Sequence, residues 1–537
     1  MRLTWKELRL SKLRLIFLVF FILLLTPFVK FFDLNQDKER FILAGKGRAY
    51  VEDIKNHPRK KILDRNNNEL AVSILRSTLL FRSEEEKDLG IRFSEISNEP
   101  IFLTNPKRIY FENEIDKKFI NDLKSFCKCV AISEPIYRRY YPHGGIVSPL
   151  IGFSGVGGGL EGVERSYDSI LSSDVENINF FRDGKGRRVK GDIKDFIENR
   201  LKDDLRLTID INIQYKVFQE LKQAISDAKA KGGYAVLMNS RNGDILAIAS
   251  YPTFNPNRND RVVQRNLSLD EYLEPGSLIK PLTIAGAIKH GLISKDTIID
   301  TNPGYVNLSG FKRSEAGGKN FGELNPAEII INSSQVGIAK IAIQQSEDDI
   351  YSNLRNFGIG RSLDLNWYGI DSSYLYDNQK LYDIDKASLG YGYLIRANIV
   401  QLARAYSVFA NKGKMVEPKI TFDAKTNALD VISEDTAEYI LNALRSTVIN
   451  GTADSISNSL VNIAGKTGTT EKYIVGTGYA PGKYISSFAS IFPYEDPEFV
   501  MVVSIDEPNP NNYFGGEISA PIVAKVAEYM QSNGYIE

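Results

Sequence analysis

One segment near the N-terminus is apolar enough to span a membrane, and it limits how the rest of the chain can be arranged. Residues 15–29 are almost wholly apolar, and Phe31 and Phe32 extend the run past Lys30, whose long side chain can reach the interface. No other stretch of the sequence is apolar over such a length. We therefore predict a single transmembrane helix over residues 15–33.

The charges around this segment predict its orientation. The residues before it are strongly basic, with a single acidic residue, Glu7, among them. Because positive flanks stay in the cytoplasm, residues 1–14 are predicted to form a cytoplasmic tail, with everything after about residue 33 outside. A cleaved signal peptide is the alternative, but residues 26–32 lack the small residues of a cleavage site. The basic residues are Arg2, Lys6, Arg9, Lys12 and Arg14.

Composition excludes several classes of function. The 537 residues allow roughly two or three domains, and 67 basic against 67 acidic residues argue against a nucleic-acid-binding protein. The sequence contains only three histidines, which makes a histidine-based triad or metal site improbable. Its two cysteines, Cys127 and Cys129, are separated by one residue, so two thiols are favoured over a strained disulfide.

The most informative motif for chemistry places a hydroxyl and an amine three residues apart. Ser277 and Lys280 follow Glu274-Pro275-Gly276 at a predicted helix start, and positions i and i+3 share one helical face. Such a pair supplies a nucleophile and its base, with free backbone N–H groups nearby for an oxyanion. An ordinary amphipathic helix with one exposed serine is the alternative. His290 lies about four turns away, too far to act as the base.

Two later segments favour the chemical interpretation. Residues 465–469 read Gly-Lys-Thr-Gly-Thr after an apolar stretch, which predicts the edge strand of a sheet. Between the two motifs, Ser333-Ser334-Gln335 opens a predicted helix through residue 342. S-x-x-K, an S-x-N-like element and K-T-G in this order resemble the signature of penicillin-binding proteins and serine β-lactamases. Gln335 stands where that family has asparagine, and a cap for the helix is the alternative role of Ser333 or Ser334.

The region after the membrane segment also resembles this family. Residues 59–71 predict a strand, an asparagine-rich turn and a second strand, as in the pedestal domain of class B penicillin-binding proteins. Residues 139–144 and 152–164 resemble its next motifs, although plain turn chemistry also explains their glycines. We therefore expect a non-catalytic pedestal over residues 34–204 and a transpeptidase domain over residues 205–537.

The resemblance implies the architecture of the second domain. It implies an α/β fold, more fully an α+β sandwich, in which a five-stranded antiparallel sheet is flanked by helices. The local patterns that fit it are a strand over 205–210, helices over 213–230 and 520–530, a hairpin over 234–249, and strands over 488–492 and 499–505.

The resemblance also assigns roles to the motif residues. Ser277 is expected to attack the bond between the last two D-alanines of a peptidoglycan stem peptide, with Lys280 as its base and Ser333 as a proton relay. Burial and the charge of Lys466 are expected to lower the pKa of Lys280. The expected substrate-binding residues are Gln335, Thr467, Gly468 and Thr469, and no metal or cofactor is implied.

Three segments, residues 274–276, 390–392 and 513–517, most resemble the septal, cell-division transpeptidase of this family. The expected partners are stem peptides, β-lactams, the inner membrane, a polytopic peptidoglycan glycosyltransferase and other division proteins, with no nucleic acid. An elongation-type transpeptidase and a D,D-carboxypeptidase remain alternatives. A non-catalytic β-lactam sensor or division scaffold and a β-lactamase fit less well, because the motif set is intact and the chain is built around an anchor and a large pedestal.

Overall fold

The computed structural model describes part of the chain in detail. It covers residues 15–27, 50–52, 58–81, 101–105, 108–111, 130–155, 158–172, 179–181 and 204–536, without 259–265, 371–372, 378–379 and 475, and the single positions 30, 88, 91 and 125. Cys127 and Cys129 lie outside these residues. The chain divides into two compact units, Met1–His57 with Ser173–Lys202, and Pro58–Ser172 with Asp203–Glu537.

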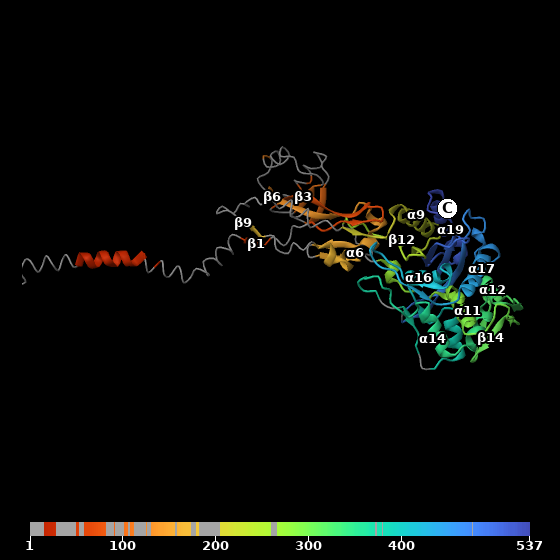
Figure 1. The fold of residues 1–537 in the computed structure, drawn as a ribbon. Coiled ribbons are helices and arrows are strands. Elements are labelled where there is room, and N and C mark those ends of the chain that lie inside the picture. The colour runs from red at the N-terminus through yellow and green to blue at the C-terminus, as the bar shows by residue number, and fades with distance from the viewer. Residues whose placement is uncertain are drawn as a thin grey trace, which may run out of the picture. The chain divides into compact units, whose positions relative to one another are not determined.

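A five-stranded antiparallel sheet forms the centre of the second unit, as predicted (Figure 1). Two of its strands, β11 and β23, are mostly apolar and are buried along nearly their whole length because both faces of the sheet are covered. The K-T-G motif lies on the last strand, which is an edge strand as predicted. In spatial order the strands are β12 (Ile245–Tyr251), β11 (Gly232–Asn239), β23 (Phe499–Asp506), β22 (Gly478–Phe492) and β21 (Ala464–Ile474).

Helices cover both faces of this sheet. Because side chains alternate along a strand, Leu237 packs with α9 (Ile211–Asp227) and α19 (Ala520–Ser532), whereas its neighbour Val236 packs on the opposite side. That side carries α11 (Lys280–Lys289) and α16 (Ile399–Ala410). The sandwich implied by the resemblance is therefore present.

The remaining elements of the transpeptidase region are shorter, apart from α17, which is as long as α9, and α13 and α14, which are as long as α11. The helices α13 and α15 pack against each other, and α13 also contacts α11. Several small two-stranded sheets accompany these helices. The elements are α10 (Leu267–Asp270), α12 (Pro326–Ile331), α13 (Gln335–Gln344), α14 (Glu347–Asn356), α15 (Asp383–Gly390), α17 (Glu434–Asn450), α18 (Gly515–Ile518), β13 (Ile299–Asp300), β14 (Tyr305–Leu308), β15 (Phe311–Ser314), β16 (Glu323–Leu324), β17 (Tyr374–Leu375), β18 (Ile395–Arg396), β19 (Lys414–Val416) and β20 (Ala428–Asp430).

The strand predicted over residues 205–210 is much shorter than expected. Only Leu205–Arg206 forms β10, and it pairs in parallel with β2 (Ile62–Leu63) instead of joining the five-stranded sheet. The cause is Asp210, whose carboxylate accepts hydrogen bonds from the N–H groups of Asn212 and Ile213 and so begins α9. The alternating pattern therefore reflects burial of an irregular segment.

The predicted strand, turn and strand over residues 59–71 is confirmed. β2 pairs antiparallel with β3 (Glu69–Phe81), which also pairs with β6 (Val130–Tyr140). Buried charges hold this region together, since fully buried Glu164 binds Arg59 at 3.0 Å and Arg139 at 2.6 Å. Breaking such a buried network costs about 3–5 kcal/mol per partner removed, so it stabilises the region once formed.

The N-terminal apolar segment is helical where the structure describes it. Residues 15–27 form a helix, and the large apolar side chains from Leu15 to Leu25 are all exposed. Within the described residues, no helix is both long and apolar enough to cross a membrane. In the same unit β1 (Tyr50–Glu52) pairs antiparallel with β9 (Asn179–Phe181).

Candidate active site

Ser277 sits in a tight turn that two distant segments hold in place. The turn is a 3₁₀ helix over Gly276–Ile279, and α11 follows it directly, with Pro281 tolerated in the first turn as predicted. The N–H of Gly276 donates to the carbonyl of Gly392 at 3.0 Å, and the Tyr406 hydroxyl donates to the carbonyl of Leu278 at 2.8 Å. These bonds fix the backbone on both sides of the serine.

Gly392 permits this arrangement only because it has no side chain. Its φ is +89°, and a Cβ there would lie 2.0 Å from the Gly276 carbonyl oxygen. We expect Gly392→Ala to displace the Ser277 turn, lowering acylation about a hundredfold and the free energy of unfolding by about 1–3 kcal/mol. Penicillin acylation kinetics and denaturant unfolding measure the two effects.

Gly291→Ala is the matched control for that variant. Gly291 also has a positive φ, +71°, but nothing lies within 4 Å of the Cβ that alanine would add. Both alanines therefore carry the backbone strain of the left-handed region, and only Gly392→Ala carries the clash. Equal acylation rates in the two variants would show that the contact with Gly276 does not position the serine.

Lys280 is the first residue of α11 and is fully buried. Its Nζ donates to the backbone carbonyl of Ser333 at 2.6 Å and to the Ser333 hydroxyl at 3.1 Å. Ser333 presents both oxygens because its backbone is in the left-handed region, with φ +54°. The structure thus joins the first two motifs through Lys280 and Ser333, while the described contacts include no hydrogen bond from Lys280 to Ser277.

Burial makes Lys280 suited to act as a base. Desolvation lowers its pKa to about 7, although the negative charge of Glu315 works in the opposite direction. Lys466 is also fully buried, and its pKa is lowered well below the usual value, first by burial and then by the charge of Lys280. Burial therefore lowers the pKa of Lys280, as expected, and the repulsion between the two buried amines is expressed in the lowered pKa of Lys466.

The K-T-G strand lies against the serine turn. A Cβ on Gly468 would come within 3.1 Å of the Leu278 side chain, so glycine allows β21 to approach the turn closely. The Thr467 hydroxyl is 2.6 Å from that of Thr452, and the Thr469 hydroxyl accepts from the N–H of Gly515 at 3.2 Å. The three motifs are therefore brought together at the serine turn.

The start of α13 shows which of Ser333 and Ser334 caps this helix, a point that the sequence left open. Ser334 is the N-cap of α13, because its hydroxyl accepts from the N–H of Gly337 at 2.9 Å. Ser333 is not the cap, and its hydroxyl faces Lys280 instead. Gln335 begins α13, and its side chain is half-buried beside these residues.

Glu315 belongs to this site and was not identified from the sequence. It follows β15, is 97% buried, and accepts hydrogen bonds from the Ser334 hydroxyl at 2.5 Å and the N–H groups of Gln335 at 2.6 Å and Val336 at 3.2 Å. The negative charge of this carboxylate therefore offsets the partial positive charge at the N-terminus of α13. It is 19 residues from Ser334, and no motif spacing signals the contact.

We expect Glu315→Gln to affect both stability and pH dependence. A glutamine side chain presents one acceptor oxygen where the carboxylate presents two, so a buried N–H loses its partner at a cost of about 1–3 kcal/mol. Because the charge of Glu315 raises the pKa of Lys280, its removal should move the acid limb of acylation to lower pH. Glu323→Gln, an exposed glutamate on β16, is the control. An unchanged midpoint in Glu315→Gln would contradict the electrostatic link.

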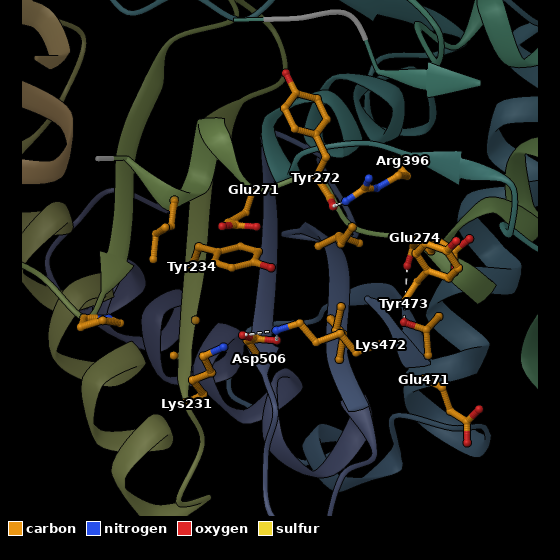
Figure 2. A pocket seen from close by; sticks show the side chains of 17 residues that line it. Lys231, Tyr234, Glu271, Tyr272, Glu274, Arg396, Glu471, Lys472, Tyr473 and Asp506 are labelled. Atoms are coloured by element: carbon orange, nitrogen blue, oxygen red, sulfur yellow. Dashed lines mark hydrogen bonds and ion pairs between the residues drawn. The ribbon is translucent and has the colours of Figure 1, made fainter. Parts of the chain in front are cut away.

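A pocket of about 340 Å³ adjoins the serine turn. Figure 2 shows Glu274, Glu471 and Tyr473 at one end of it and the ion pair between Lys472 and Asp506 below. Glu274 lies just before the serine turn, so the pocket borders the candidate site. Within the described part of the chain, no group of three or more His, Cys, Asp or Glu side chains is placed to hold a metal ion.

Comparisons with known proteins agree with this site. The sequence model of the penicillin-binding protein transpeptidase domain matches residues 233–528. The chain is 28% identical to the peptidoglycan D,D-transpeptidase FtsI of Buchnera aphidicola, over 97% of this chain and 94% of the relative. It is also 28% identical to FtsI of Escherichia coli, with 87% and 82% covered. The probable peptidoglycan D,D-transpeptidase PbpC of Pseudomonas aeruginosa is 32% identical, with 73% and 69% covered.

Solved structures extend the comparison. The transpeptidase domain of penicillin-binding protein 3 from Burkholderia pseudomallei is 30% identical with a TM-score of 0.55, covering 61% of this chain and 96% of that one. Penicillin-binding protein 3 of Mycobacterium tuberculosis, complexed with aztreonam, has a TM-score of 0.68 at 23% identity, covering 90% and 97%, and shows the shared fold. The chain belongs to the penicillin-binding protein transpeptidases and is a class B member of the septal type.

Proposed function

We propose that this chain is a peptidoglycan D,D-transpeptidase of septal wall synthesis. Ser277 Oγ attacks the carbonyl carbon of the penultimate D-alanine and forms an ester, while the terminal D-alanine leaves with a proton on its amine. The amine of a second stem peptide then attacks the ester, forms the cross-linking amide and returns a proton to Ser277. The steps balance without a metal or cofactor.

Each motif residue has a place in this cycle. Neutral Lys280 takes the proton of Ser277, and Ser333, hydrogen-bonded to Lys280, passes it to the leaving amine. The N–H groups of Ser277 and Thr469 form the oxyanion hole. Substrate contacts come from the Gln335 amide, from Lys466 and the hydroxyls of Thr467 and Thr469 at the terminal carboxylate, and from Gly468, which lets the peptide approach the strand.

The observation that carries the proposal is the state of Lys280. A buried lysine with a pKa of about 7 is half neutral at physiological pH, so it can accept a proton there. It contacts Ser333 of the second motif and acts electrostatically on Lys466 of the third. An ordinary buried lysine with only a structural role would be paired with a carboxylate, and Lys280 instead contacts hydroxyl and carbonyl oxygens.

The location and partners follow from the same family. We propose residues 1–14 as the cytoplasmic tail, 15–33 as the anchor, 34–204 as the pedestal and 205–537 as the catalytic domain. The exposed apolar side chains over residues 15–25 support an anchor in the inner membrane, because such a surface is unfavourable in water. A polytopic glycosyltransferase and other division proteins are the proposed partners, with stem peptides and β-lactams as ligands.

Fluorescent penicillin tests the proposal directly. Labelling that persists for many minutes, with D-alanine released from a stem peptide only when an acceptor amine is present, is expected of a transpeptidase. Release of D-alanine into water alone would identify a carboxypeptidase, and rapid loss of label would identify a β-lactamase. Absence of labelling would leave a scaffold with an inactive site.

A further inference from the structure

Glu507 follows β23 directly and has a backbone conformation that glutamate rarely adopts. Its φ is +49°, in the left-handed region, although it is not a glycine. Such a conformation persists only where surrounding contacts hold it, and residues of this kind cluster at functional sites. The contacts of Glu507 therefore indicate whether its position serves the reaction.

Three lysines surround the Glu507 carboxylate, and each comes from a different part of the sheet. Lys472 on β21 binds it at 3.0 Å, Lys483 on β22 at 3.1 Å, and Lys231, just before β11, at 3.3 Å. Lys472 also binds Asp506 at 2.6 Å (Figure 2). The Glu507 side chain is only 18% exposed, so water and salt screen its pairs less than they screen pairs on an open surface.

The lysines keep the Glu507 carboxylate charged. Burial by itself would raise the pKa of Glu507, but the hydrogen bonds from Lys472 and Lys483 outweigh this effect and lower the pKa to about 2. The carboxylate is therefore negative at every working pH. Through its ion pairs it links the end of β23 to β22 and to the edge strand β21.

The segment that begins at Glu507 returns to the sheet at Tyr513. The N–H of Glu507 donates to the carbonyl of Tyr484 on β22 at 2.9 Å. The Tyr484 and Tyr513 rings are stacked with their centroids 3.8 Å apart, and the Ser486 hydroxyl donates to the Tyr513 carbonyl. Both ends of this segment are therefore attached to β22.

The residues after Tyr513 bring a backbone N–H group to Thr469 of the K-T-G strand. The N–H of Gly515 donates to the Thr469 hydroxyl at 3.2 Å. Because the hydroxyl oxygen accepts this bond, its single hydrogen points elsewhere and can donate to a substrate carboxylate. The contact with Gly515 thus orients Thr469 for the carboxylate-binding role that is proposed above.

Glu507 reaches Thr469 by two routes that end on the same side chain. One route runs along β21 from Lys472, and the other runs through the segment that ends at Gly515. Removing the charge of Glu507 would loosen both routes at once. A displacement of about 1 Å in a binding contact can cost as much as a hundredfold in rate, so a small shift of Thr469 is enough to be measured.

We propose that Glu507 is a positioning residue outside the catalytic site, and that its ion pairs with Lys472 and Lys483 hold Thr469 in its working orientation. The inference rests on the proposed function, because that function gives Thr469 its role. Glu507 acts through Thr469 and takes no part in the chemical step. A cluster of ion pairs that only stabilised the fold would not discriminate between ligands with and without a carboxylate.

The test compares benzylpenicillin with its methyl ester on the purified full-length chain. The ester replaces the charged carboxylate by a neutral group, which accepts a weaker hydrogen bond from the Thr469 hydroxyl. Acylation rates from intact-protein mass spectrometry give the ratio of acid to ester, in which general losses of folded protein cancel. In the wild type the acid should react faster by about tenfold or more.

Two variants remove the ion pairs of Glu507. Glu507→Gln keeps the size of the side chain without its charge, and it should lower the ratio of acid to ester about fivefold. Lys483→Met removes one partner at a lysine that is 46% exposed, so the fold should be kept, and the ratio should fall about twofold. The double variant should match Glu507→Gln alone, because both changes break the same contact.

Asp496→Asn is the matched control. Asp496 binds Arg241 at 2.6 Å in the turn before β23, at the other end of that strand from Glu507. Its replacement also removes an ion pair from the sheet, but at a place with no contact to Thr469, so the ratio should stay at the wild-type value.

Failure of the inference differs from failure of the proposed function. An unchanged ratio in Glu507→Gln and Lys483→Met, or an equal fall in Asp496→Asn, would overturn the positioning role while acylation of the wild type still supports the proposed function. If Glu507→Gln does not fold, the ratio in Lys483→Met decides. Absence of wild-type acylation by both compounds would overturn the proposed function and the inference with it.

Discussion

Ser277→Ala is expected to lose penicillin labelling completely and to lower the rate of D-alanine release on the order of 10⁴-fold or more. The serine hydroxyl oxygen is the proposed nucleophile, and Gly276, Leu278 and Ile279, the other residues of the turn, have no nucleophilic side chain. Ser277 is only half-buried in a short 3₁₀ helix, so loss of one oxygen should leave the fold intact. Labelling by fluorescent penicillin and thermal unfolding of the same sample check both statements.

Ser352→Ala is the control for this result. Ser352 is an exposed serine on α14, and its replacement should leave labelling and melting temperature unchanged. Persistent labelling in Ser277→Ala with loss of labelling in another serine variant would move the nucleophile elsewhere. Loss of labelling together with loss of the folded state would require mass spectrometry of the acylated wild-type peptide to place the acyl group.

Replacing Lys280 by methionine should have the second largest effect, lowering acylation about 10³-fold while keeping the chain folded. Methionine fills the same buried space without an amine to desolvate, so the free energy of unfolding should not fall. If Lys280 is the base, as proposed, its neutral form is the active one in the wild type. Its fraction rises with pH through about 7, so acylation should rise tenfold per pH unit below pH 7 and level off above.

The variant Lys280→Arg tests whether residue 280 acts through its positive charge or as a base. Arginine keeps a positive charge at every working pH and cannot act as the base, so this variant should be as slow as the methionine variant. A wild-type acylation rate that is flat between pH 5 and 9, or rapid acylation by Lys280→Met, would assign proton transfer to another group. Stopped-flow acylation across this pH range distinguishes these outcomes.

Most residues of the proposed catalytic site could be selected from the sequence because they lie at the starts of helices or beside glycines. Ser277 and Lys280 share a helix start, Ser333 precedes a helix, and Lys466 follows an apolar stretch and lies beside a glycine, so short patterns mark these positions and their order carries the resemblance. Their assembly at one site followed from the family resemblance, since nothing in the local patterns specifies the distance between motifs. The sheet and its flanking helices were predicted on the same two grounds.

The parts that were missed depend on contacts between distant segments. Glu315 reaches the start of α13 through a hairpin whose sequence has no distinguishing pattern, and burial alone turns an ordinary glutamate into a charge that acts on Lys280. The extent to which Lys280 and Lys466 are buried could not be read from the sequence either, because burial depends on how distant segments pack around the two amines. The strand over residues 205–210 was overestimated, since alternation reflects burial as readily as pairing.

The open edge of β21 has a consequence for solubility as well as for catalysis. A free edge has unpaired N–H and C=O groups, which can pair with the sheet of another molecule and cause aggregation. Here Leu278 and Pro275 lie close to Gly468, and Gly515 lies close to the Gly468 carbonyl oxygen. These neighbours flank the edge at Gly468 and hinder its pairing with the sheet of another molecule, so the same residues that border the proposed substrate site also oppose aggregation.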